Sequence, residues 1–487
     1  MAEDQPSDPL VIADGRPWDL LVVGGGTAGL VAAHTAAELG ATALLVERHR
    51  TGGDCLWTGC VPSKSLLASA HAAAAARAAS RLGVSVVDVQ VDFPAVMRHV
   101  REAIATIEPV DSPAALRAAG VAVAHGTLSF TGSRSAQVDG QSVAFTQAVV
   151  ATGSAPVMPD VPGLMAANPL TSDSVWDLEE LPARLLVVGG GPVGCELGQG
   201  FARLGSRVVM IETGPRLLGR EHPAAADLVR EALAADGVDV RTGSSLVAVA
   251  GAAGGWTARL DSSADVGFDR VLVAIGRRPR TEHLALSRAG VRLTGSGHVK
   301  VDRRLRTTNP RIWAAGDVTG HPPFTHSAGV HAALAASNAV LGLWRTVDPE
   351  TIPRVTYTQP EVAAFGISGD AAAVTIRRTD HRDVDRAITS GATGGFTELA
   401  LNRRGRVVGA TTVGPRAGEV LAEAVLAARA GIPARRIAGI MHAYPTWSDG
   451  VWKGAVDQSR AELSAPVVRR GIQALAAVRR RWMQRGG

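Results

Sequence analysis

Residues 20–47 of the chain read LLVVGGGTAGLVAAHTAAELGATALLVE, and residues 185–212 read LLVVGGGPVGCELGQGFARLGSRVVMIE. Each stretch begins with an apolar run and a glycine-rich turn, continues with small and apolar residues, and ends with a second apolar run and a glutamate. This order is typical of a βαβ unit, in which two parallel strands flank one helix. The repeat therefore predicts an α/β fold that contains two similar nucleotide-binding domains.

The glycines of the two turns share the spacing GxGxxG and are Gly24, Gly26 and Gly29 in the first stretch and Gly189, Gly191 and Gly194 in the second. In this motif the first glycine permits a tight turn, the second lets the backbone approach a pyrophosphate, and the third allows close packing of helix on strand. Glu47 and Glu212 each follow the last glycine by 18 positions (47 − 29 and 212 − 194), where a carboxylate can bind ribose hydroxyls. We therefore predict two bound nucleotides.

Composition is that of an ordinary globular protein. The 487 residues, 46% of them hydrophobic and 20% charged, suggest roughly three domains of about 150 residues. No apolar stretch reaches the ~20 residues of a transmembrane helix, and the start, MAEDQPSDPL, lacks a signal-peptide pattern. A soluble, cytoplasmic protein is expected. The net charge of +5 is modest and no nucleic-acid motif is present, so no nucleic-acid partner is expected.

Three cysteines in a chain of this length exclude a disulfide-stapled secreted scaffold. Cys55 and Cys60 lie close together in sequence, and in a reducing compartment such a pair is more often catalytic or metal-binding than structural. Zinc would need two further ligands, and no CxxC or paired histidine lies nearby. We therefore favour a redox pair and expect no metal site. Cys195, in the helix of the second glycine motif, is interpreted as a small buried packing residue.

The stretch around the two cysteines, residues 52–64, reads GGDCLWTGCVPSK. With it the chain resembles the class I pyridine nucleotide–disulfide oxidoreductases, the family that includes dihydrolipoamide dehydrogenase, glutathione reductase and mercuric reductase. The resemblance extends from about residue 18 to 460, and further matching stretches are ATGSAP (151–156), VAIGRRP (273–279), AAGDV (314–318), YTQPEVAAFG (357–366) and HAYPT (442–446). It implies an FAD-dependent enzyme that passes electrons from NAD(P)H through the flavin to a redox-active Cys55–Cys60 disulfide.

The cysteine spacing also constrains local structure. In a regular helix Cys55 and Cys60 would lie on different faces, so Cys55 is expected at an irregular helix start, where backbone amides and the helix dipole stabilise a thiolate. The resemblance implies that Cys60 faces the flavin and that Cys55 is the interchange thiol that meets the substrate. It also implies that Lys64 lies beside the flavin ring, paired with Glu196.

Other cofactor contacts carry over by their positions in the matching motifs. The residues expected at FAD, besides those of the first glycine motif, are Gly53, Lys64, Gly126 to Leu128, Thr152, Gly153, Ser154, Asp317, Phe324, Thr325 and His326. Asp317 would bind the ribityl chain; alone it could be a helix cap, but the preceding AAG and the following helix favour the flavin. Gly276 would line the nicotinamide nucleotide site. Glu212 predicts that NADH is preferred, because a carboxylate repels a 2′-phosphate, although Arg216 lies nearby in sequence.

One motif departs from the family pattern. The disulfide-reducing branches place an acid–base histidine, supplied by the partner subunit, where this chain has Tyr444, and Asp449 replaces the glutamate that orients it. An unperturbed tyrosine has a pKa near 10 and an imidazole near 6.5, so tyrosine can donate a proton but is a poor base at neutral pH. Efficient dihydrolipoamide oxidation is therefore not expected. His442 could substitute, although a structural hydrogen-bonding role is favoured for it.

The electron acceptor stays open between a small-molecule disulfide, a metal ion and a quinone. Tyrosine at position 444 is what mercuric reductase has, but the tail, which ends in RRRWMQRGG, lacks the cysteine pair that hands over the metal in that enzyme. One rival hypothesis is a flavin reductase of quinones or metal ions that bypasses the cysteines. Another is a non-catalytic FAD-binding module, which would need neither a second nucleotide site nor the cysteine pair.

Local patterns predict the elements between the motifs. Alanine-rich stretches at 64–82 and 96–119 predict helices, and a short β-rich region extends from there to Val150. A helix is expected from about His326. The alternation of apolar and polar residues over 397–414 is typical of antiparallel strands, and helices should follow from about residue 416.

The family resemblance implies three domains and a homodimer. The FAD-binding domain is split between 17–155 and 279–350, the NAD(P)-binding domain 156–278 is inserted into it, and an α+β dimerisation domain covers 351–465. In the dimer, Tyr444 of the partner subunit would reach Cys55.

The tail, residues 466–487, is basic and amphipathic, with Ile472, Leu475, Val478 and Trp482 on one side. Such a segment could touch anionic lipid. A single short segment more often packs on its own protein or frays, so membrane contact is not the favoured interpretation.

Overall fold

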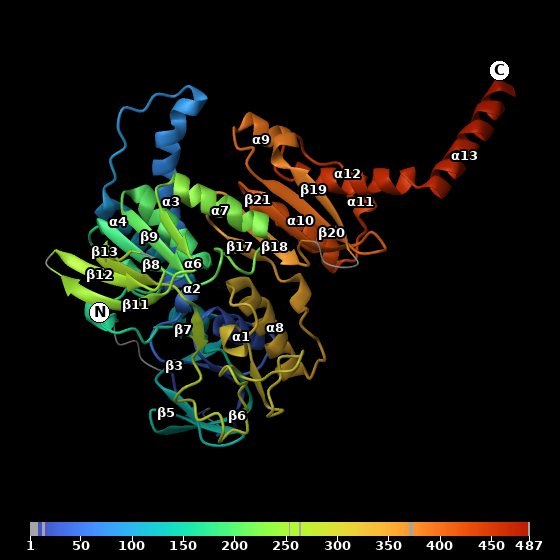
Figure 1. Ribbon diagram of the computed structural model, residues 1–487. Coiled ribbons are helices and arrows are strands. Elements are labelled where there is room, and N and C mark those ends of the chain that lie inside the picture. Colours follow the sequence, from blue (N-terminus) through green and yellow to red (C-terminus); the bar gives the residue numbers. More distant parts are fainter. Residues whose placement is uncertain (1–7, 12–14, 253, 263, 370–373, 486–487) are drawn as a thin grey trace. The chain divides into compact units, whose positions relative to one another are not determined.

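A computed structural model of the chain describes residues 8–11, 15–252, 254–262, 264–369 and 374–485 (Figure 1). The chain forms two compact units. The first contains Met1–Leu217 and Leu233–Pro349, and the second contains Leu218–Ala232 and Glu350–Gly487. None of the described helices is both long and apolar enough to span a bilayer.

The largest sheet of the first unit has neighbouring strands in the order β3-β2-β1-β6-β5-β4, and β16 also pairs with β6. The pairings among β1, β2, β3, β6 and β16 are parallel, whereas β4, β5 and β6 form an antiparallel meander. These strands are β1 (Trp18–Val23), β2 (Ala43–Glu47), β3 (Val121–His125), β4 (Leu128–Phe130), β5 (Ser135–Val138), β6 (Gln141–Val150) and β16 (Ile312–Ala314).

The second sheet of this unit is parallel throughout, in the order β10-β9-β8-β14. A three-stranded antiparallel sheet, β11-β12-β13, and the two-stranded pair β15-β7 complete the strands. They are β7 (Ser154–Pro156), β8 (Arg184–Val188), β9 (Arg207–Glu212), β10 (Asp239–Thr242), β11 (Leu246–Ala252), β12 (Gly255–Leu260), β13 (Val266–Phe268), β14 (Arg270–Val273) and β15 (Arg277–Pro279).

Each parallel sheet contains one of the two repeated stretches as a βαβ unit, β1-α1-β2 in the first and β8-α6-β9 in the second. The predicted α/β fold with two Rossmann-like sheets is therefore confirmed. The helices of this unit are α1 (Thr27–Glu38), α2 (Gly53–Trp57), α3 (Cys60–Ala78), α4 (Phe93–Ile107), α5 (Pro113–Ala118), α6 (Pro192–Leu204) and α8 (Thr325–Leu341). Helix α7 (Pro223–Ala235) has residues in both units.

The strand registers bring distant loops together. Val23 at the end of β1 pairs with Val46 of β2 on one side and Val150 of β6 on the other. Because the carboxyl ends of parallel strands meet at one edge of a sheet, the loops that follow β1, β2 and β6 gather there. Helices α1 and α8 pack together beside the sheet, and their contact is rich in buried alanines such as Ala32, Ala36 and Ala335.

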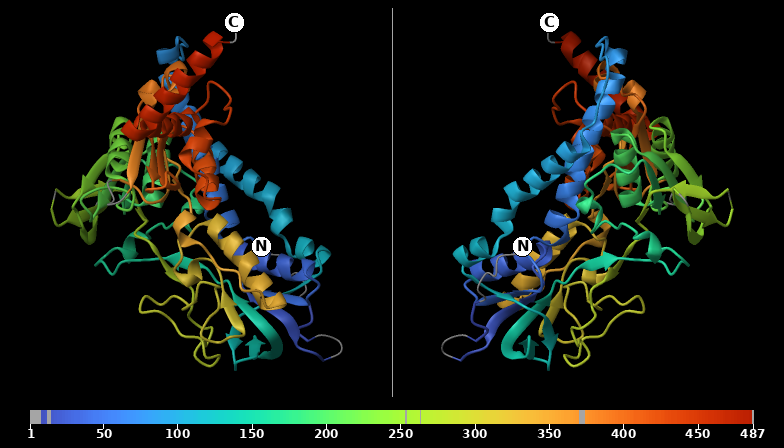
Figure 2. Two further views of the ribbon diagram at one scale, coloured as in Figure 1. Left: turned by 90° about the vertical axis from the view of Figure 1, so that its right-hand side faces the viewer. Right: turned by 90° about the vertical axis from the view of Figure 1, so that its left-hand side faces the viewer.

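The predicted helix at 64–82 is confirmed as α3, which begins earlier, at Cys60, and continues as the 3₁₀ helix η1 (Ala79–Leu82). Helix α3 packs against α4 (Figure 2) and α6. The stretch 96–119 is not one helix but three pieces, α4, η2 (Glu108–Asp111) and α5. Pro109 and Pro113 explain the breaks, because proline has no N–H to donate and disfavours helix at the preceding residue.

The second unit is built on one antiparallel sheet in the order β17-β18-β21-β20-β19. Its strands confirm the antiparallel prediction for 397–414, and helix α10 confirms the predicted helices after 416. The elements are β17 (Arg354–Thr356), β18 (Glu361–Gly366), β19 (Thr375–Asp380), β20 (Phe396–Leu401), β21 (Val407–Gly414), α9 (Asp385–Thr389), α10 (Ala417–Arg429), α11 (Ala434–Ala438), α12 (Asp449–Ser464) and α13 (Pro466–Arg485). Helices α10 and α12 pack on the sheet around buried Leu399 and Val451.

The tail forms helix α13, separated from α12 by a single residue. Ala465 has φ −58° and ψ 133°, an extended conformation that is favoured before proline. Pro466 then begins α13 at the first helical position, where its missing N–H costs nothing. The apolar side chains of α13 do not pack on the described part of its unit, since Leu475 is 72% exposed and Trp482 64% exposed. The described residues show α13 as a helix whose apolar side chains are exposed in the single chain, so the favoured expectation that the tail packs on its own protein or frays stays a prediction.

The fold generates a prediction at Gly194, the third glycine of the second motif. A Cβ added there would lie 1.9 Å from the carbonyl oxygen of Gly189, whereas one added at Gly191 meets no atom within 4 Å. Replacing Gly194 with alanine should therefore destabilise the protein by about 1–3 kcal/mol, as overpacking does, measured by urea unfolding. Gly191→Ala is the matched control and should change stability by less than about 0.5 kcal/mol. Equal stability of the two variants would contradict the close contact.

Candidate active site

The two cysteines lie on either side of a break between two helices. Cys55 is in the short helix α2, and Cys60 is the first residue of α3. Gly59 makes the break possible, because a Cβ at this position would lie 2.7 Å from the carbonyl oxygen of Asp54. Cys55 lies in the first turn of the short helix α2, as expected of an irregular helix start, and Cys60 begins the separate helix α3. Cys60 takes the first position of α3, where a helix start favours a thiolate.

Both cysteines are free thiols in the structure, and each perturbs the pKa of the other. Side-chain hydrogen bonding with Cys55 lowers the pKa of Cys60 to about 6, and the same interaction raises the pKa of Cys55. Burial opposes the shift at Cys60, whereas the Thr325 hydroxyl, 3.3 Å from the Cys60 Sγ, and the Lys64 ammonium lower its pKa further. The arrangement holds one thiolate at Cys60 and one thiol at Cys55 near neutral pH.

Lys64 lies one turn of α3 beyond Cys60, on the same side of the helix. Its Nζ is 2.8 Å from the Oε2 of Glu196, a buried residue of α6. The predicted pairing of Lys64 with Glu196 is thus confirmed. The pair links the helix that starts at Cys60 to the helix of the second glycine motif.

The first glycine motif forms a bare backbone cradle beside the cysteines. Gly24 has φ +104°, which favours glycine, and a Cβ added at Gly53 would lie 2.5 Å from the Cα of Gly26. The two loops therefore touch through backbone alone. Glu47 accepts hydrogen bonds from the backbone N–H groups of Gly25 (2.6 Å) and His49 (2.7 Å). Each carboxylate oxygen has a second lone pair for a ribose hydroxyl, so this cradle fits the adenosine and pyrophosphate of FAD.

The remaining predicted flavin residues collect at the same edge of the sheet. The Ser154 hydroxyl donates to the Oδ2 of Asp317 at 2.6 Å, and the Thr152 hydroxyl donates to the carbonyl of Arg280 at 2.7 Å. Gly153 has φ +68°, so it also takes a conformation that favours glycine. The N–H of Gly126, just before Leu128 and β4, donates to the carbonyl of Glu47.

Helix α8 presents its N-terminus to Cys60. Phe324 is the N-cap and Thr325 the first helical residue, whose hydroxyl contacts the Cys60 Sγ. The rings of Phe324 and His326 stack, with centroids 5.2 Å apart and planes 8° apart. The helix starts at Thr325, one residue before the predicted start at His326.

One group of residues was missed from the sequence. Arg277 of β15 forms an ion pair with Asp54, the residue before Cys55, and its Nε donates to the Ser154 hydroxyl at 2.8 Å. Arg280 also contacts Asp54, at 3.3 Å, and Arg277 reaches Asp173 at 3.4 Å. Burial raises the pKa of Asp54, against the lowering effect of the two arginines. This ion-pair cluster joins the cysteine loop to Asp317 through Ser154, and in the sequence Arg277 was marked only by the matching stretch VAIGRRP (273–279).

The second glycine motif repeats the geometry of the first. Gly189 has φ +113°, and Glu212 accepts from the backbone N–H groups of Gly190 (2.7 Å) and Gly214 (2.6 Å). Gly276 has φ +127° with open space where a Cβ would point. Because the loop is again bare backbone beside a carboxylate, these residues fit a nicotinamide nucleotide.

Cys195 has the packing role that was predicted. Its side chain is fully buried in α6 and donates to the carbonyl of Gly190 at 3.4 Å. Burial raises the pKa of this thiol, so it stays protonated and unreactive.

The motif with Tyr444 lies in the second unit, between α11 and α12. Tyr444 is 72% exposed, and its hydroxyl donates to the Oδ2 of Asp385 at 2.5 Å, a bond that raises the tyrosine pKa. Asp449 is buried at the start of α12 and faces the Thr446 hydroxyl at 3.5 Å. Tyr444 is thus held in its protonated form.

His442 is engaged through both ring nitrogens. Its Nε2 lies 2.8 Å from Glu423 Oε1, and its Nδ1 lies 2.9 Å from the carbonyl of Ile440. Burial lowers the pKa of His442, but these two bonds and the Glu423 charge outweigh it and raise the pKa overall. The structural hydrogen-bonding role favoured for His442 agrees with this geometry.

A thiolate–thiol pair beside one of two nucleotide cradles defines a flavin- and nicotinamide-dependent disulfide oxidoreductase. Comparison with known proteins agrees. The pyridine nucleotide-disulphide oxidoreductase family matches residues 18–332, and the dimerisation domain of the same family matches residues 352–455. The chain therefore belongs to the pyridine nucleotide-disulphide oxidoreductases, enzymes that use FAD and NAD(P)H. The dimerisation domain supports a homodimer.

Named relatives span two activities. The chain is 36% identical over 449 residues to a mercuric reductase of Streptomyces lividans, covering 89% of this chain and 94% of that one. It is 31% identical over 467 residues to a dihydrolipoyl dehydrogenase of Geobacillus stearothermophilus, covering 92% and 97%. Among solved structures, LpdA from Mycobacterium tuberculosis superposes with a TM-score of 0.81 at 27% identity, covering 90% of this chain and 99% of that one.

The Cys60 environment generates a pH prediction. The long-wavelength thiolate–flavin band of the two-electron-reduced enzyme should require the Cys60 thiolate, so it should be present above a midpoint of about 6 and lost below it. Thr325→Val removes a hydrogen-bond donor to the thiolate and should raise this midpoint by about 1 pH unit. Thr325→Ser keeps the hydroxyl and is the control. The same midpoint in the valine and serine variants would show that Thr325 does not stabilise the thiolate.

The ion-pair cluster generates a stability prediction. Arg277→Lys keeps the charge but loses the planar fork that contacts Asp54 and Ser154. Since the pair is only partly buried, the variant should lose about 1–2 kcal/mol of unfolding free energy, measured on the FAD-loaded protein by urea. Arg278→Lys, at an exposed pair with Glu282, is the control and should change stability by less than about 0.5 kcal/mol. An Arg277→Lys variant as stable as the control would refute the structural role of the cluster.

Proposed function

We propose that the chain uses NAD(P)H to reduce a small acceptor, foremost a disulfide, at the Cys55–Cys60 pair. The observation that carries this proposal is the hydrogen-bonded pair itself, with the Cys60 pKa lowered to about 6 beside Thr325 and Lys64. A buried packing pair would not need a stabilised thiolate at a helix start. The pair therefore has the electronic asymmetry that thiol–disulfide exchange requires.

The residues proposed to hold FAD are those of the first cradle, namely Gly24, Gly26, Gly29, Glu47, Gly53, Lys64, Leu128, Thr152, Gly153, Ser154, Asp317, Phe324, Thr325 and His326. The nicotinamide nucleotide would lie on Gly189, Gly191, Gly194, Glu212 and Gly276. When bound, FAD supplies the chemistry that couples a two-electron donor to a disulfide. The backbone amides of the two loops and the starts of α1 and α6 would bind the pyrophosphates.

Our proposed exchange uses both cysteines. In the reduced pair, the Cys60 thiolate takes the proton of Cys55 through the hydrogen bond that joins them. The Cys55 thiolate then attacks one sulfur of the acceptor disulfide, forms a mixed disulfide and releases one thiolate. After losing its proton to that thiolate, Cys60 attacks the Cys55 Sγ and displaces the second thiolate. The products are two reduced thiols, once protonated, and an oxidised Cys55–Cys60 disulfide.

We propose that the partner's Tyr444 donates a hydrogen bond to the second departing thiolate, which then takes its proton from solvent. The bond to Asp385 raises the Tyr444 pKa, so the phenol stays protonated and is a poor base at neutral pH. His442, bound to Glu423, and Asp449 would position the loop around it.

A metal ion is the second candidate acceptor. The 36% identity to a mercuric reductase and the tyrosine at 444 favour it, because a thiophilic ion can bind two thiolates without an acid–base residue. A quinone reduced without the cysteines is the third possibility. The three acceptors differ in their need for Cys55, which makes them separable.

We also propose the domain boundaries given by the sequence: FAD binding at 17–155 and 279–350, NAD(P) binding at 156–278, dimerisation at 351–465, and a tail at 466–487. The matched family ranges and the sheet memberships support them. A cytoplasmic location is inferred from the three cysteines in 487 residues, which exclude a disulfide-stapled secreted scaffold.

The direct test of function is steady-state turnover with NADH and a series of acceptors: lipoamide, glutathione disulfide, Hg(II) and a soluble quinone. Activity with a disulfide or Hg(II) should fall at least about 10³-fold in Cys55→Ser, because covalent exchange loses its nucleophile. Cys195→Ser is the matched control and should keep full activity. Wild-type activity in Cys55→Ser with every acceptor would sink the proposal in favour of a reductase that bypasses the cysteines.

Glu212 predicts the nucleotide preference. With its carboxylate at the end of β9, kcat/KM should be higher with NADH than with NADPH, because the carboxylate repels a 2′-phosphate. Glu212→Gln removes the charge and should reduce the NADH-to-NADPH ratio by about tenfold. A wild-type enzyme with the higher kcat/KM for NADPH would overturn the preference and point to Arg216.

Tyr444 predicts the effect of restoring a base. Tyr444→His should raise the rate of dihydrolipoamide oxidation by NAD by about 10–100-fold, because imidazole accepts a proton near neutral pH. Tyr444→Phe, which has neither proton nor base, should lower disulfide reduction. If histidine and phenylalanine at this position behave alike in both directions, Tyr444 has no part in the exchange.

A further inference from the structure

Helix α13 divides into an apolar and a basic sector. At about 100° per residue, its large apolar side chains fall within an arc of about 160° and are Val467, Val468, Ile472, Leu475, Val478, Trp482 and Met483. The opposite arc holds the arginines and glutamines Arg469, Arg470, Gln473, Arg480, Arg481 and Gln484. Every one of the apolar side chains is at least 43% exposed. The apolar sector is thus complete, continuous and uncovered by the described chain.

The excess positive charge of the chain comes from this helix. Six arginines and no acidic residue lie between 466 and 485. Removing these six from the 50 basic residues leaves 44, against 45 acidic residues in the rest of the chain. The formal net charge of +5 is therefore the sum of +6 on the tail and −1 on the rest of the chain. Such a concentration of one sign selects an anionic surface.

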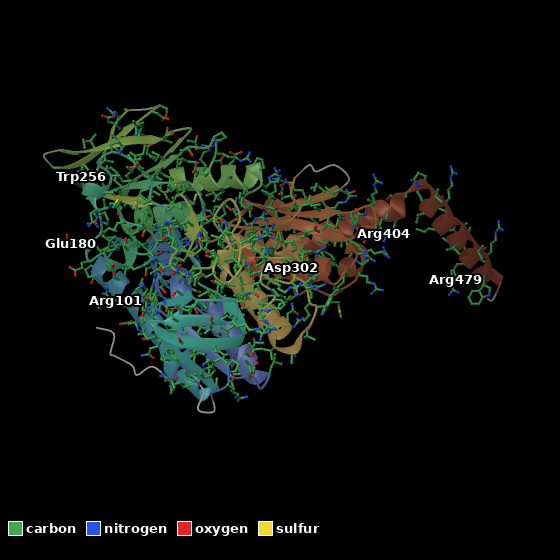
Figure 3. The ribbon with its side chains drawn as sticks, turned by 90° about the horizontal axis from the view of Figure 1, so that it is seen from below. Arg101, Glu180, Trp256, Asp302, Arg404 and Arg479 are labelled. Carbon is green, nitrogen blue, oxygen red and sulfur yellow. The ribbon has the colours of Figure 1, made fainter. Side chains whose placement is uncertain are left out.

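Arg479 lies inside the apolar arc, between the directions of Val468 and Ile472, and Arg485 falls at the edge of the arc in the direction of Val467. The Arg479 guanidinium carbon lies 4.6 Å from the centre of the Trp482 ring, and Figure 3 shows Arg479 on the projecting tail helix. A long arginine side chain can cover an apolar ring with its stem and raise its charged end to the lipid headgroups. Tryptophan itself favours the boundary between headgroups and acyl chains.

We propose that α13 binds an anionic lipid surface, lying in its plane with the apolar arc in the acyl boundary and the arginines at the headgroups. A helix that lies on the surface needs a strong apolar and a strong basic face, and α13 has both. A partner protein would need an acidic groove as long as the helix, whereas anionic lipid offers negative charge along its whole length. The single extended residue Ala465 before Pro466 sets α13 apart from α12 and leaves both faces accessible.

The test is flotation of the full-length FAD-loaded enzyme with two kinds of vesicle, phosphatidylcholine alone and phosphatidylcholine mixed with phosphatidylglycerol. Wild type should bind the mixed vesicles, bind the neutral ones far more weakly, and release at high salt. Arg480→Gln with Arg481→Gln should weaken binding about 30-fold. Leu475→Gln, at a 72% exposed site, should weaken it about tenfold.

The matched control is Arg403→Gln with Arg404→Gln. These two exposed arginines lie on the turn between β20 and β21, in the same unit (Arg404 is labelled in Figure 3), and their loss changes the net charge equally. Binding of the control should equal that of wild type. NADH-dependent turnover in solution should be unchanged in all these variants, so failure of lipid binding and failure of the proposed function are separate results.

Three results would overturn the proposal. Wild type that fails to float with the mixed vesicles removes it outright. Equal binding by wild type and the Arg480→Gln, Arg481→Gln variant would place the lipid contact elsewhere. Dissociation of the homodimer by Leu475→Gln, measured by light scattering, would show that a second copy of the chain covers the apolar arc.

Discussion

The juxtaposition of the Cys55 and Cys60 thiols across the break between α2 and α3 is the constraint on which the rest of the site depends. It forms because the chain breaks between α2 and α3 at Gly59, where only a residue without a Cβ can pass so close to the Asp54 carbonyl. The break returns Cys60 to the side of Cys55 and gives it the first position of a helix. One sulfur then carries the negative charge and the other the proton. A single regular helix would separate the two side chains by about 140° and abolish this asymmetry.

The parallel sheet supplies the surroundings of the cysteine pair from distant parts of the chain. Thr325 comes from the start of α8, Glu196 from α6, and Arg277 from β15, yet each contacts the cysteine segment directly or through one neighbour. Because carboxyl ends of parallel strands meet at one edge, the loops proposed to hold FAD lie near the start of α8, which supplies Thr325 to Cys60. The ion pair of Asp54 with Arg277 couples this segment to Ser154 and Asp317. The cofactor cradle and the redox pair are in this way one connected structure.

The α/β fold could be predicted from the sequence, because glycine spacing, strand length and the glutamates that end each βαβ unit are local patterns. The positions implied by those patterns are the ones observed for Gly24, Gly189, Glu47 and Glu212. The Lys64–Glu196 pair could also be predicted, from the resemblance of the cysteine motif to the family. The break at Gly59 could not be predicted from the sequence, because it is caused by a close contact with Asp54. The Arg277 cluster could not be predicted either, because Arg277 and its partner Asp54 are over 200 positions apart in the sequence. The tail showed its amphipathic pattern, but exposure of that pattern depends on tertiary packing, which periodicity alone does not determine.

Anaerobic titration of the oxidised enzyme with NADH shows whether the Cys60 sulfur lies against the flavin and takes up its electrons. After one equivalent of NADH, a long-wavelength thiolate–flavin band should appear while the flavin itself stays oxidised, and Cys60→Ser should abolish that band. Direct bleaching of the flavin by the first equivalent in the wild-type enzyme, with no such band at any pH above about 6, would contradict this placement of Cys60.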